Sequence, residues 1–97
     1  DTKYKLIPMD GIYAVTVLHE HDTYKAMLYI GNRPTINGTK QNIEVNIFDF
    51  NKDIYGEELT IYLHKLIRED RKYSDLDALK NQLAIDKVDA VSILKNI

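Results

Sequence analysis

Glu44 carries the acidic side chain in this sequence that is best placed to act as a general base. It lies in Ile43-Glu44-Val45-Asn46-Ile47-Phe48-Asp49-Phe50, where apolar and polar residues at first alternate. A period of two is typical of a β-strand with one apolar and one polar face. Carboxylates are depleted in strands and costly to bury without a partner. The polar face with Glu44 and Asn46 is therefore either open to water or the lining of a site.

Two arginines and a tyrosine near predicted loops extend the set of candidates. Arg33 and Arg68 could bind phosphate or carboxylate through the two-pronged guanidinium, or could be ordinary exposed charges. Tyr55, directly before Gly56, could stack on an aromatic ligand or close one end of a barrel. A base such as Glu44 needs a rigid strand, because misplacement by about 1 Å can cost roughly 100-fold in rate.

Other constellations of catalytic or metal-binding residues are missing. The sequence has no Cys, which excludes disulfides and thiolate metal sites. It also has no Gly-rich phosphate loop of the P-loop or dinucleotide type. His19 and His21 are expected in a hairpin turn and are predicted to be surface residues, whereas His64 is predicted to be a hydrogen-bonded sheet residue. We therefore assign no metal ligand.

The composition fits one small globular domain that acts on small molecules or proteins. A chain of 97 residues can form one core without the staples needed below about 40 residues. The formal net charge of −2 lacks the basic footprint of nucleic-acid-binding domains. No apolar run approaches the roughly 18 residues of a membrane span, and no signal peptide is visible. We expect a cytoplasmic protein without nucleic-acid or membrane partners.

Four segments with the β pattern must position the candidates. Strands are predicted at 12–18, 24–30, 43–50 and 58–67. The polar stretch 31–42 contains Gly and Pro and is predicted to be a long mobile loop, a kind of segment that is often functional. The alternation breaks at Ile47-Phe48, which predicts a bulge or a strand that leaves the sheet.

One or two helices are predicted after the strands. Ser74 and Asp77 have the spacing of a capping box, which predicts a helix that begins at Ser74. Two apolar stripes follow at helical spacing: Leu76, Leu79 and Leu83, then Val88, Val91 and Leu94. Strands followed by a helix favour an antiparallel sheet curled into a barrel. We expect a single domain over 1–97, with a barrel at about 6–67 and a helical tail at about 74–95.

Several ordered blocks of the sequence together resemble the riboflavin kinase family. In bacteria this module is the C-terminal half of the bifunctional riboflavin kinase/FAD synthetase. The resemblance runs from about residue 6 to residue 94. It is carried by Gly11-Ile12-Tyr13-Ala14-Val15, Ile30-Gly31-Asn32-Arg33-Pro34-Thr35, the strand around Glu44, Ile54-Tyr55-Gly56, Ile67-Arg68, Arg71-Lys72-Tyr73 and Gln82-Leu83-Ala84-Ile85-Asp86.

The resemblance implies a fold, a reaction and a set of site residues. The fold would be a six-stranded antiparallel, Greek-key-like β-barrel with a C-terminal α-helix. The reaction would transfer the γ-phosphoryl group of ATP to the 5′-hydroxyl of riboflavin, giving FMN, with Mg²⁺ or another divalent metal. Glu44 would be the catalytic base. The flavin would be bound by Asn46, Arg68, Lys72 and Tyr73, and ATP would be bound near Tyr55 and Gly56.

The sequence departs from the family pattern at its beginning. The family carries a G-x-x-x-G-x-P-T-A-N segment before its G-V-Y-A-V strand, and the Thr and Asn of that segment help to hold metal and phosphates. This sequence begins after that place. We therefore expect an N-terminally truncated chain that lacks the first strand and has weak or no activity alone. Pro34-Thr35-Ile36-Asn37 belongs to a later block, so no metal ligand is carried onto it.

Two functions follow from the sequence. The first is a riboflavin kinase module of a bifunctional FAD synthetase, whose partner would be an N-terminal FMN adenylyltransferase domain. The alternative is a non-catalytic flavin-binding or protein-docking barrel that lacks the metal and phosphate segment. Both use the same predicted fold, and they differ in whether Glu44 does chemistry.

Overall fold

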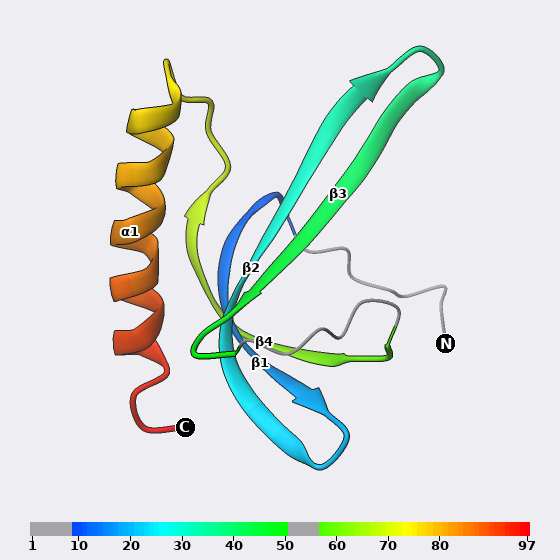
Figure 1. Cartoon of the computed structure of the whole chain (residues 1–97). Coiled ribbons are helices and arrows are strands. Elements are labelled where there is room, and N and C mark those ends of the chain that lie inside the picture. Colours follow the sequence, from blue (N-terminus) through cyan, green and yellow to red (C-terminus); the bar gives the residue numbers. More distant parts are fainter. Residues whose placement is uncertain (1–8, 51–56) are drawn as a thin grey trace.

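The computed structural model describes residues 9–50 and 57–97, which form one sheet and one helix (Figure 1). The elements are β1 (Gly11–His19), β2 (Asp22–Thr35), β3 (Gly38–Ile47), β4 (Thr60–Glu69) and α1 (Leu76–Ile93). The sheet has the order β3-β2-β1-β4, and all its pairs are antiparallel. The mainly β class, the four predicted strands and the helix after them are confirmed. The described residues form four strands of an open sheet, not six.

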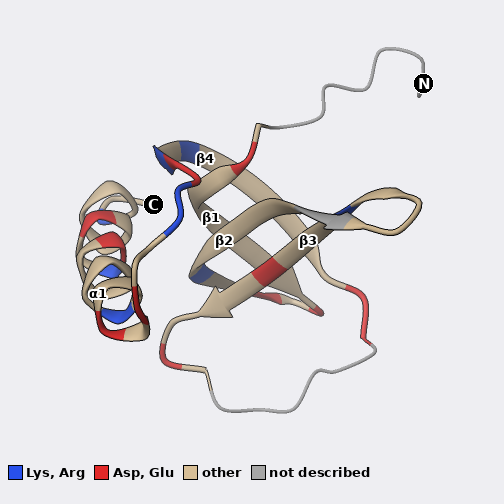
Figure 2. Ribbon diagram, turned by 90° about the horizontal axis from the view of Figure 1, so that it is seen from above, with Lys and Arg blue, Asp and Glu red and all other residues tan. Residues whose placement is uncertain are grey.

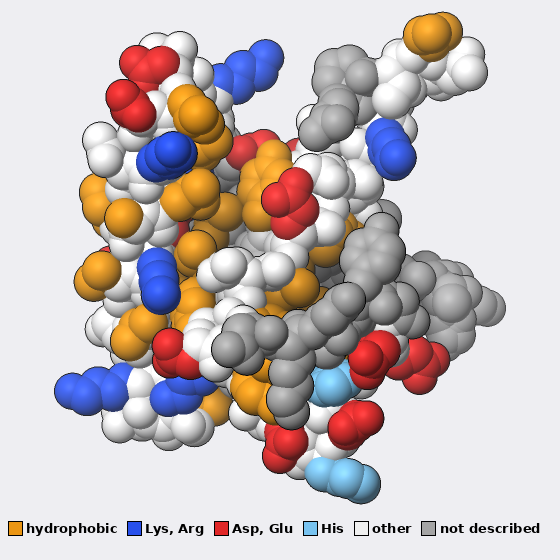
Figure 3. All heavy atoms as spheres, in the orientation of Figure 1, with side chains coloured by type: hydrophobic (Ala, Val, Ile, Leu, Met, Phe, Trp, Pro, Cys, Tyr) orange, Lys and Arg blue, Asp and Glu red, His pale blue; other side chains and the backbone are white. Residues whose placement is uncertain are grey.

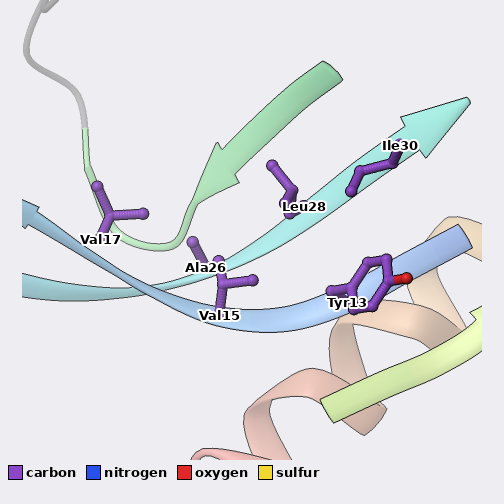
Figure 4. Packing of buried hydrophobic residues seen from close by; sticks show 6 residues of the cluster. All are labelled: Tyr13, Val15, Val17, Ala26, Leu28 and Ile30. Atoms are coloured by element: carbon purple, nitrogen blue, oxygen red, sulfur yellow. The ribbon is translucent and has the colours of Figure 1, made fainter. Parts of the chain in front are cut away.

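β1 is the central strand and is buried on both faces. On one face, three of its side chains pack against three from β2, which point to the same side of the two strands (Figure 4). The register places Tyr13 opposite Leu28 and Val15 opposite Ala26. Paired residues share a face of the sheet, so the alternating apolar residues of both strands meet in one core. The cluster consists of Tyr13, Val15, Val17, Ala26, Leu28 and Ile30.

The opposite face of β1 is covered by α1. Ala14 packs there with Phe48, Ala90 and Leu94, all of which are buried. β3 ends at Ile47, and the chain then leaves the strand so that Phe48 enters this second core. The predicted break at this point is confirmed. Helix and sheet are thus joined by a small apolar contact beside the central strand.

The stretch 31–42 was predicted to be a loop, but the structure makes it a β-hairpin. β2 continues to Thr35 and β3 begins at Gly38, so Ile36 and Asn37 form a two-residue turn. Gly38 has a φ of 139°, which glycine adopts without steric cost. Among the described residues, β1 pairs with β2 only as far as Ile30, and proline is tolerated on a strand edge that is not paired. The prediction was wrong because pairing between the two strands overrides the local breaker residues.

The chain forms one helix of 18 residues after the strands, which settles the question left open by the sequence. Its buried face carries Asp86, Ala90 and Leu94, spaced by four residues. The predicted stripe was wrong for Val88 and Val91, which are 69% and 48% exposed. The apolar residues do not mark the buried face of the helix here, because the acid Asp86 occupies one of its buried positions. Within the described residues, no helix has the length and apolar character needed to cross a membrane.

The helix begins one residue later than the predicted capping box. The Asp75 backbone is extended, and its Oδ1 accepts a hydrogen bond from the Ala78 backbone N–H at 2.8 Å. Asp75 is therefore the N-cap, and Ser74 precedes the cap. Asp77 lies in the first turn, where a negative charge is favoured by the helix dipole.

His19 was predicted to be a surface residue, and this prediction was wrong. It is 7% exposed, and its Nε2 lies 2.6 Å from Glu57 Oε1. Its ring also stands edge-on to Phe50, with 6.3 Å between ring centroids. His21 is exposed as predicted, and His64 is hydrogen-bonded in the sheet as predicted. The polar residues after Leu18 predict a turn, but His19 is still part of β1 and is buried there.

Replacing Asp75 with Ala should lower the free energy of unfolding by about 1 kcal/mol, because the first turn loses its capping hydrogen bond. For a domain of this size the melting temperature should fall by about 4–8 °C, which thermal unfolding followed by circular dichroism would measure. Ser74→Ala is the matched control and should change stability by less than about 0.5 kcal/mol. A larger loss in Ser74→Ala than in Asp75→Ala would contradict the assignment of the cap.

Candidate functional site

A row of paired residues crosses the sheet and places the candidate groups on one face. Glu44 of β3 lies opposite Tyr29 of β2, Tyr29 opposite Ile12 of β1, and Ile12 opposite Arg68 of β4. Directly opposite residues point to the same side, which here is the side that faces α1. Three strand spacings of about 4.8 Å separate Glu44 from Arg68 by roughly 14 Å along a flat sheet. The register thus spreads a base and a cation across one surface.

A cleft of about 640 Å³ lies between this surface and the first half of α1. Ile12, Leu79 and Leu83 give it apolar walls. A second hollow of about 450 Å³ shares Ile12, Tyr29, Glu44 and Leu83 with the first, so the two lie side by side. In the space-filling view a recess separates the helix from the β2–β3 hairpin (Figure 3).

The cleft brings together most of the residues that the sequence singled out. Glu44, Arg68, Lys72 and Tyr73 line the larger hollow, and Asn46 lines the smaller one. The remaining two predicted site residues, Tyr55 and Gly56, lie outside the described residues. Arg33 lies in β2, where its backbone pairs with Lys40 toward the turn of the β2–β3 hairpin.

Glu44 is exposed in the cleft and is oriented by its own strand. Asn42 Nδ2 donates a hydrogen bond to Glu44 Oε2 at 2.8 Å. Residues two apart on a strand point to the same face, so this bond arises from local geometry. It holds one carboxylate oxygen, and Oε1 is the second acceptor of the group. Asn42 was missed by the sequence analysis because it was assigned to a loop.

Tyr29 links the sheet to the connection between β4 and α1. Its hydroxyl donates a hydrogen bond to Asp70 Oδ2 at 3.1 Å. Burial raises the pKa of Tyr29, and the hydrogen bond to Asp70 and the charges of Asp70, Asp10 and Glu44 raise it further. Tyr29 is therefore a neutral donor at physiological pH. A side chain at Gly31 would overlap the Tyr29 phenol, so Tyr29 would have to move from its contact with Asp70.

Arg68 is held by a buried carboxylate of α1. Its Nε donates to both carboxylate oxygens of Asp86 at 2.9 and 3.0 Å, and its Nη2 donates to Oδ2 at 2.8 Å. Asp86 is fully buried and also accepts a hydrogen bond from Gln82 Nε2 at 2.9 Å. The hydrogen bonds to Asp86 raise the pKa of Arg68, against an opposing effect of burial. Arg68 therefore stays charged at the edge of the cleft.

The connection between β4 and α1 forms a rim of the cleft that carries charges of both signs (Figure 2). Arg71 and Lys72 are exposed there, whereas Tyr73 is half-buried. The Arg68 guanidinium carbon lies 5.5 Å from the centroid of the Tyr73 ring, within the range of a cation–π contact. The Tyr73 hydroxyl is buried and has no hydrogen-bond partner within the described part of the chain. The rim thus offers two exposed cations, together with the acids Asp70 and Asp75, and an aromatic surface.

A possible metal-binding group lies away from the cleft. His19, Glu20 and Glu57 have ligand atoms within 4.8 Å of one another, which is the one such grouping of His and acidic residues among residues 9–50 and 57–97. None of these three residues lines either hollow of the cleft. The described cleft residues therefore do not build a metal site of their own.

Comparison with known proteins identifies the family. A family model described as "Flavokinase: Riboflavin kinase" matches residues 1–94. The chain belongs to the riboflavin kinase family. A bifunctional riboflavin kinase/FMN adenylyltransferase from Bacillus subtilis is 34% identical over 95% of this chain, and the match covers 30% of that protein. The enzyme of the same name from Escherichia coli strain K12 is 38% identical over 86% of the chain and 27% of that protein.

The chain therefore spans less than a third of these curated relatives and corresponds to their riboflavin kinase module. A crystal structure described as a macrolide-efflux protein from Streptococcus pneumoniae has a TM-score of 0.79 and 41% identity to this riboflavin kinase module. That match covers 86% of this chain and 27% of the other chain. The match to the Escherichia coli enzyme likewise covers 27% of that protein. The likeness confirms the fold of the module. The description as a macrolide-efflux protein applies to that other protein only.

The raised pKa of Tyr29 predicts a loss of stability in alkali. The folded pKa lies above the unfolded value of about 10, so the stabilisation is fully present below pH 10 and is lost as pH rises through the folded pKa. Urea unfolding between about pH 9 and 11 should show a smaller decline in Tyr29→Phe than in the parent protein. Tyr62→Phe, at an exposed position, is the control and should keep the parent decline. Equal declines in all three proteins would contradict the prediction.

Proposed function

We propose that this chain transfers the γ-phosphoryl group of ATP to the 5′-hydroxyl of riboflavin, giving FMN and ADP. The observation that carries the proposal is the cleft between sheet and helix, which gathers Glu44, Arg68, Lys72 and Tyr73 on its lining. Family membership supports the reaction class. The cleft adds a base on a strand, cationic side chains on a rim of mixed charge, and apolar walls, which are elements that such a transfer can use.

Glu44 is the proposed catalytic base. It would accept the proton of the 5′-hydroxyl while that oxygen bonds to the γ-phosphorus and the bond from this phosphorus to the β,γ-bridging oxygen breaks. The leaving group is ADP, and the proton passes from Glu44 to solvent. Phosphoryl transfer depends mainly on positioning and charge stabilisation, plus one group that orients the nucleophile. The hydrogen bond from Asn42 supports this role because it fixes one carboxylate oxygen.

The flavin is the proposed occupant of the larger hollow. Its flat ring system suits the apolar walls of Ile12, Leu79 and Leu83, and its polar edge suits the rim. Lys72 and Tyr73 would contact the ring from the connection between β4 and α1. Asn46 follows Glu44 on the same face of β3 and would hydrogen-bond the ribityl hydroxyls. A cleft of about 640 Å³ lies within the range of small-molecule sites.

The position of ATP and its metal rests on the resemblance. Tyr55 and Gly56 would contact ATP, but these residues lie outside the described part of the chain. Mg²⁺ commonly keeps several waters and binds one or two carboxylates plus substrate phosphates. The described cleft residues do not form a set of metal ligands, so the divalent ion enters the proposal bound to ATP, and no step is assigned to it.

We further propose that the chain works as one module of a larger enzyme. The names of the relatives support an FMN adenylyltransferase module as its partner in the same protein. We propose with it a single domain over 1–97, a six-stranded Greek-key-like barrel and a cytoplasmic location; the family match over residues 1–94 is compatible with the single domain. The four antiparallel strands are consistent with the greater part of such a barrel, in which β3 and β4 are the edges left for further pairing.

Glu44→Gln should lower kcat for riboflavin phosphorylation by at least about 100-fold, because loss of a general base typically costs that much. FMN formation would be measured in the full-length protein that contains this chain. KM for riboflavin should stay within about twofold, since the amide keeps the shape of the side chain. Glu20→Gln, in the turn after β1, is the matched control and should keep the parent kcat.

An unchanged kcat in Glu44→Gln would contradict the assignment of the base. A parent protein that binds riboflavin but makes no FMN from riboflavin and ATP would contradict the kinase function. That second result would favour the non-catalytic flavin-binding barrel.

A further inference from the structure

We propose that Asp86 is a positioning residue for the flavin site, because it holds Arg68 in the orientation that fixes Tyr73 and the rim of the cleft. The inference deepens the proposed function and rests on it. Asp86 does not line either hollow, so it acts through Arg68 and not by contact with the substrate. The proposal assigns a role in binding to a buried acid on the helix.

The contacts of Asp86 define one orientation of the guanidinium. Three hydrogen bonds of 2.8 to 3.0 Å run from the Nε and Nη2 of Arg68 to the two carboxylate oxygens. Gln82 Nε2 donates to Oδ1 at 2.9 Å and prevents the carboxylate from turning. Paired, two-pronged contacts of this kind add directional specificity to the attraction of opposite charges. Rotation of Arg68 would therefore break several bonds at once.

Arg68 transmits this orientation to the cleft. Its guanidinium lies over the Tyr73 ring, and its Nη1 donates to the Glu69 carbonyl oxygen at 3.3 Å. One side chain thus contacts the helix, the end of β4 and the connection that forms the rim. The Tyr73 hydroxyl is buried without a described partner, so polar contacts do not hold this ring in place. Among the described residues, the cation–π contact with Arg68 is therefore the electrostatic interaction that orients the Tyr73 ring.

These contacts also change the expected role of Arg68. The edge of its guanidinium formed by Nε and Nη2 faces Asp86 and cannot grip a phosphate at the same time. Of the two readings that the sequence left open for Arg68, a two-pronged contact to phosphate or carboxylate would have to use another edge of the guanidinium. Arg68 contacts the Tyr73 ring and lines the cleft, and through these contacts it would hold the wall of the flavin pocket in place.

A buried ion pair between a helix and a sheet carries a large desolvation free energy. Removing two charges from water offsets much of their attraction, and apolar pairs of similar volume are often equally stable. Asp86 precedes Ala90 and Leu94 on the same buried face, where an apolar residue would pack well. The ion pair therefore points to a requirement for orientation and not for stability alone.

The central test compares a broken pair with an apolar replacement. Asp86→Asn leaves Arg68 poorly paired and should lower the melting temperature by about 10 °C or more. The double variant Arg68→Met with Asp86→Leu should recover most of this loss because no charge stays buried. In both variants riboflavin affinity, measured below the transition by quenching of flavin fluorescence, should weaken by about tenfold or more. KM for ATP in the full-length protein should stay within about twofold.

The matched control is Asp89→Asn, which removes an exposed acid from the same helix and should leave both stability and riboflavin affinity unchanged. A double variant that regains stability and parent affinity for riboflavin would show that the pair is only structural, and would overturn the proposal. Gln82→Met keeps the ion pair and removes one bond to Asp86, so it serves if the double variant does not fold. It should weaken riboflavin binding about threefold, and unchanged affinity would overturn the proposal.

The same experiment separates this inference from the proposed function. If the parent protein neither binds riboflavin nor forms FMN, the proposed function fails before any variant is compared. If the parent protein does both and Asp86→Asn binds riboflavin equally well, only the role of Asp86 fails.

Discussion

β1 has paired strands on both edges and packed side chains on both faces, and the other elements are placed relative to it. Its register with β2 and β4 decides which side chains of the outer strands share a surface. Since side chains alternate along each strand, a shift of one residue would move Glu44 or Arg68 to the opposite face. Burial of β1 on both faces makes such a shift costly, because apolar and polar positions would be exchanged. The cleft is therefore a consequence of core packing.

The second constraint is electrostatic and joins the helix to that sheet. Arg68 and Asp86 form a close ion pair beside a small apolar contact. This arrangement sets the orientation of α1 and of the connection before it, whose residues form the cleft rim. The apolar clusters tolerate small shifts between helix and sheet, whereas several directed hydrogen bonds do not. Packing thus brings the two layers together, and the ion pair selects one relative position.

Much of this architecture could be predicted from local pattern. The alternation around Glu44 identified its strand and the face that it shares with Asn46, and both residues line the cleft. The errors came where a partner distant in the sequence overrides local preference. Gly31 and the proline after it lie in a strand because β3 pairs with them. His19 is buried because Glu57, far along the chain, lies beside it.

The class of fold, the positions of four strands and a helix, and the family all follow from the amino-acid sequence, because they depend on periodicity and on ordered blocks of residues. Glu44 also stands out at that level, since an acid in an alternating strand is rare. Tyr29, Asn42 and Asp86 join the site only in the folded molecule. Their places depend on strand register and helix packing, which bring together residues far apart in the chain. Asp86 belongs to one of the blocks that resemble the family, but the sequence assigns it no role, and nothing in the sequence around Tyr29 distinguishes it from an ordinary strand residue.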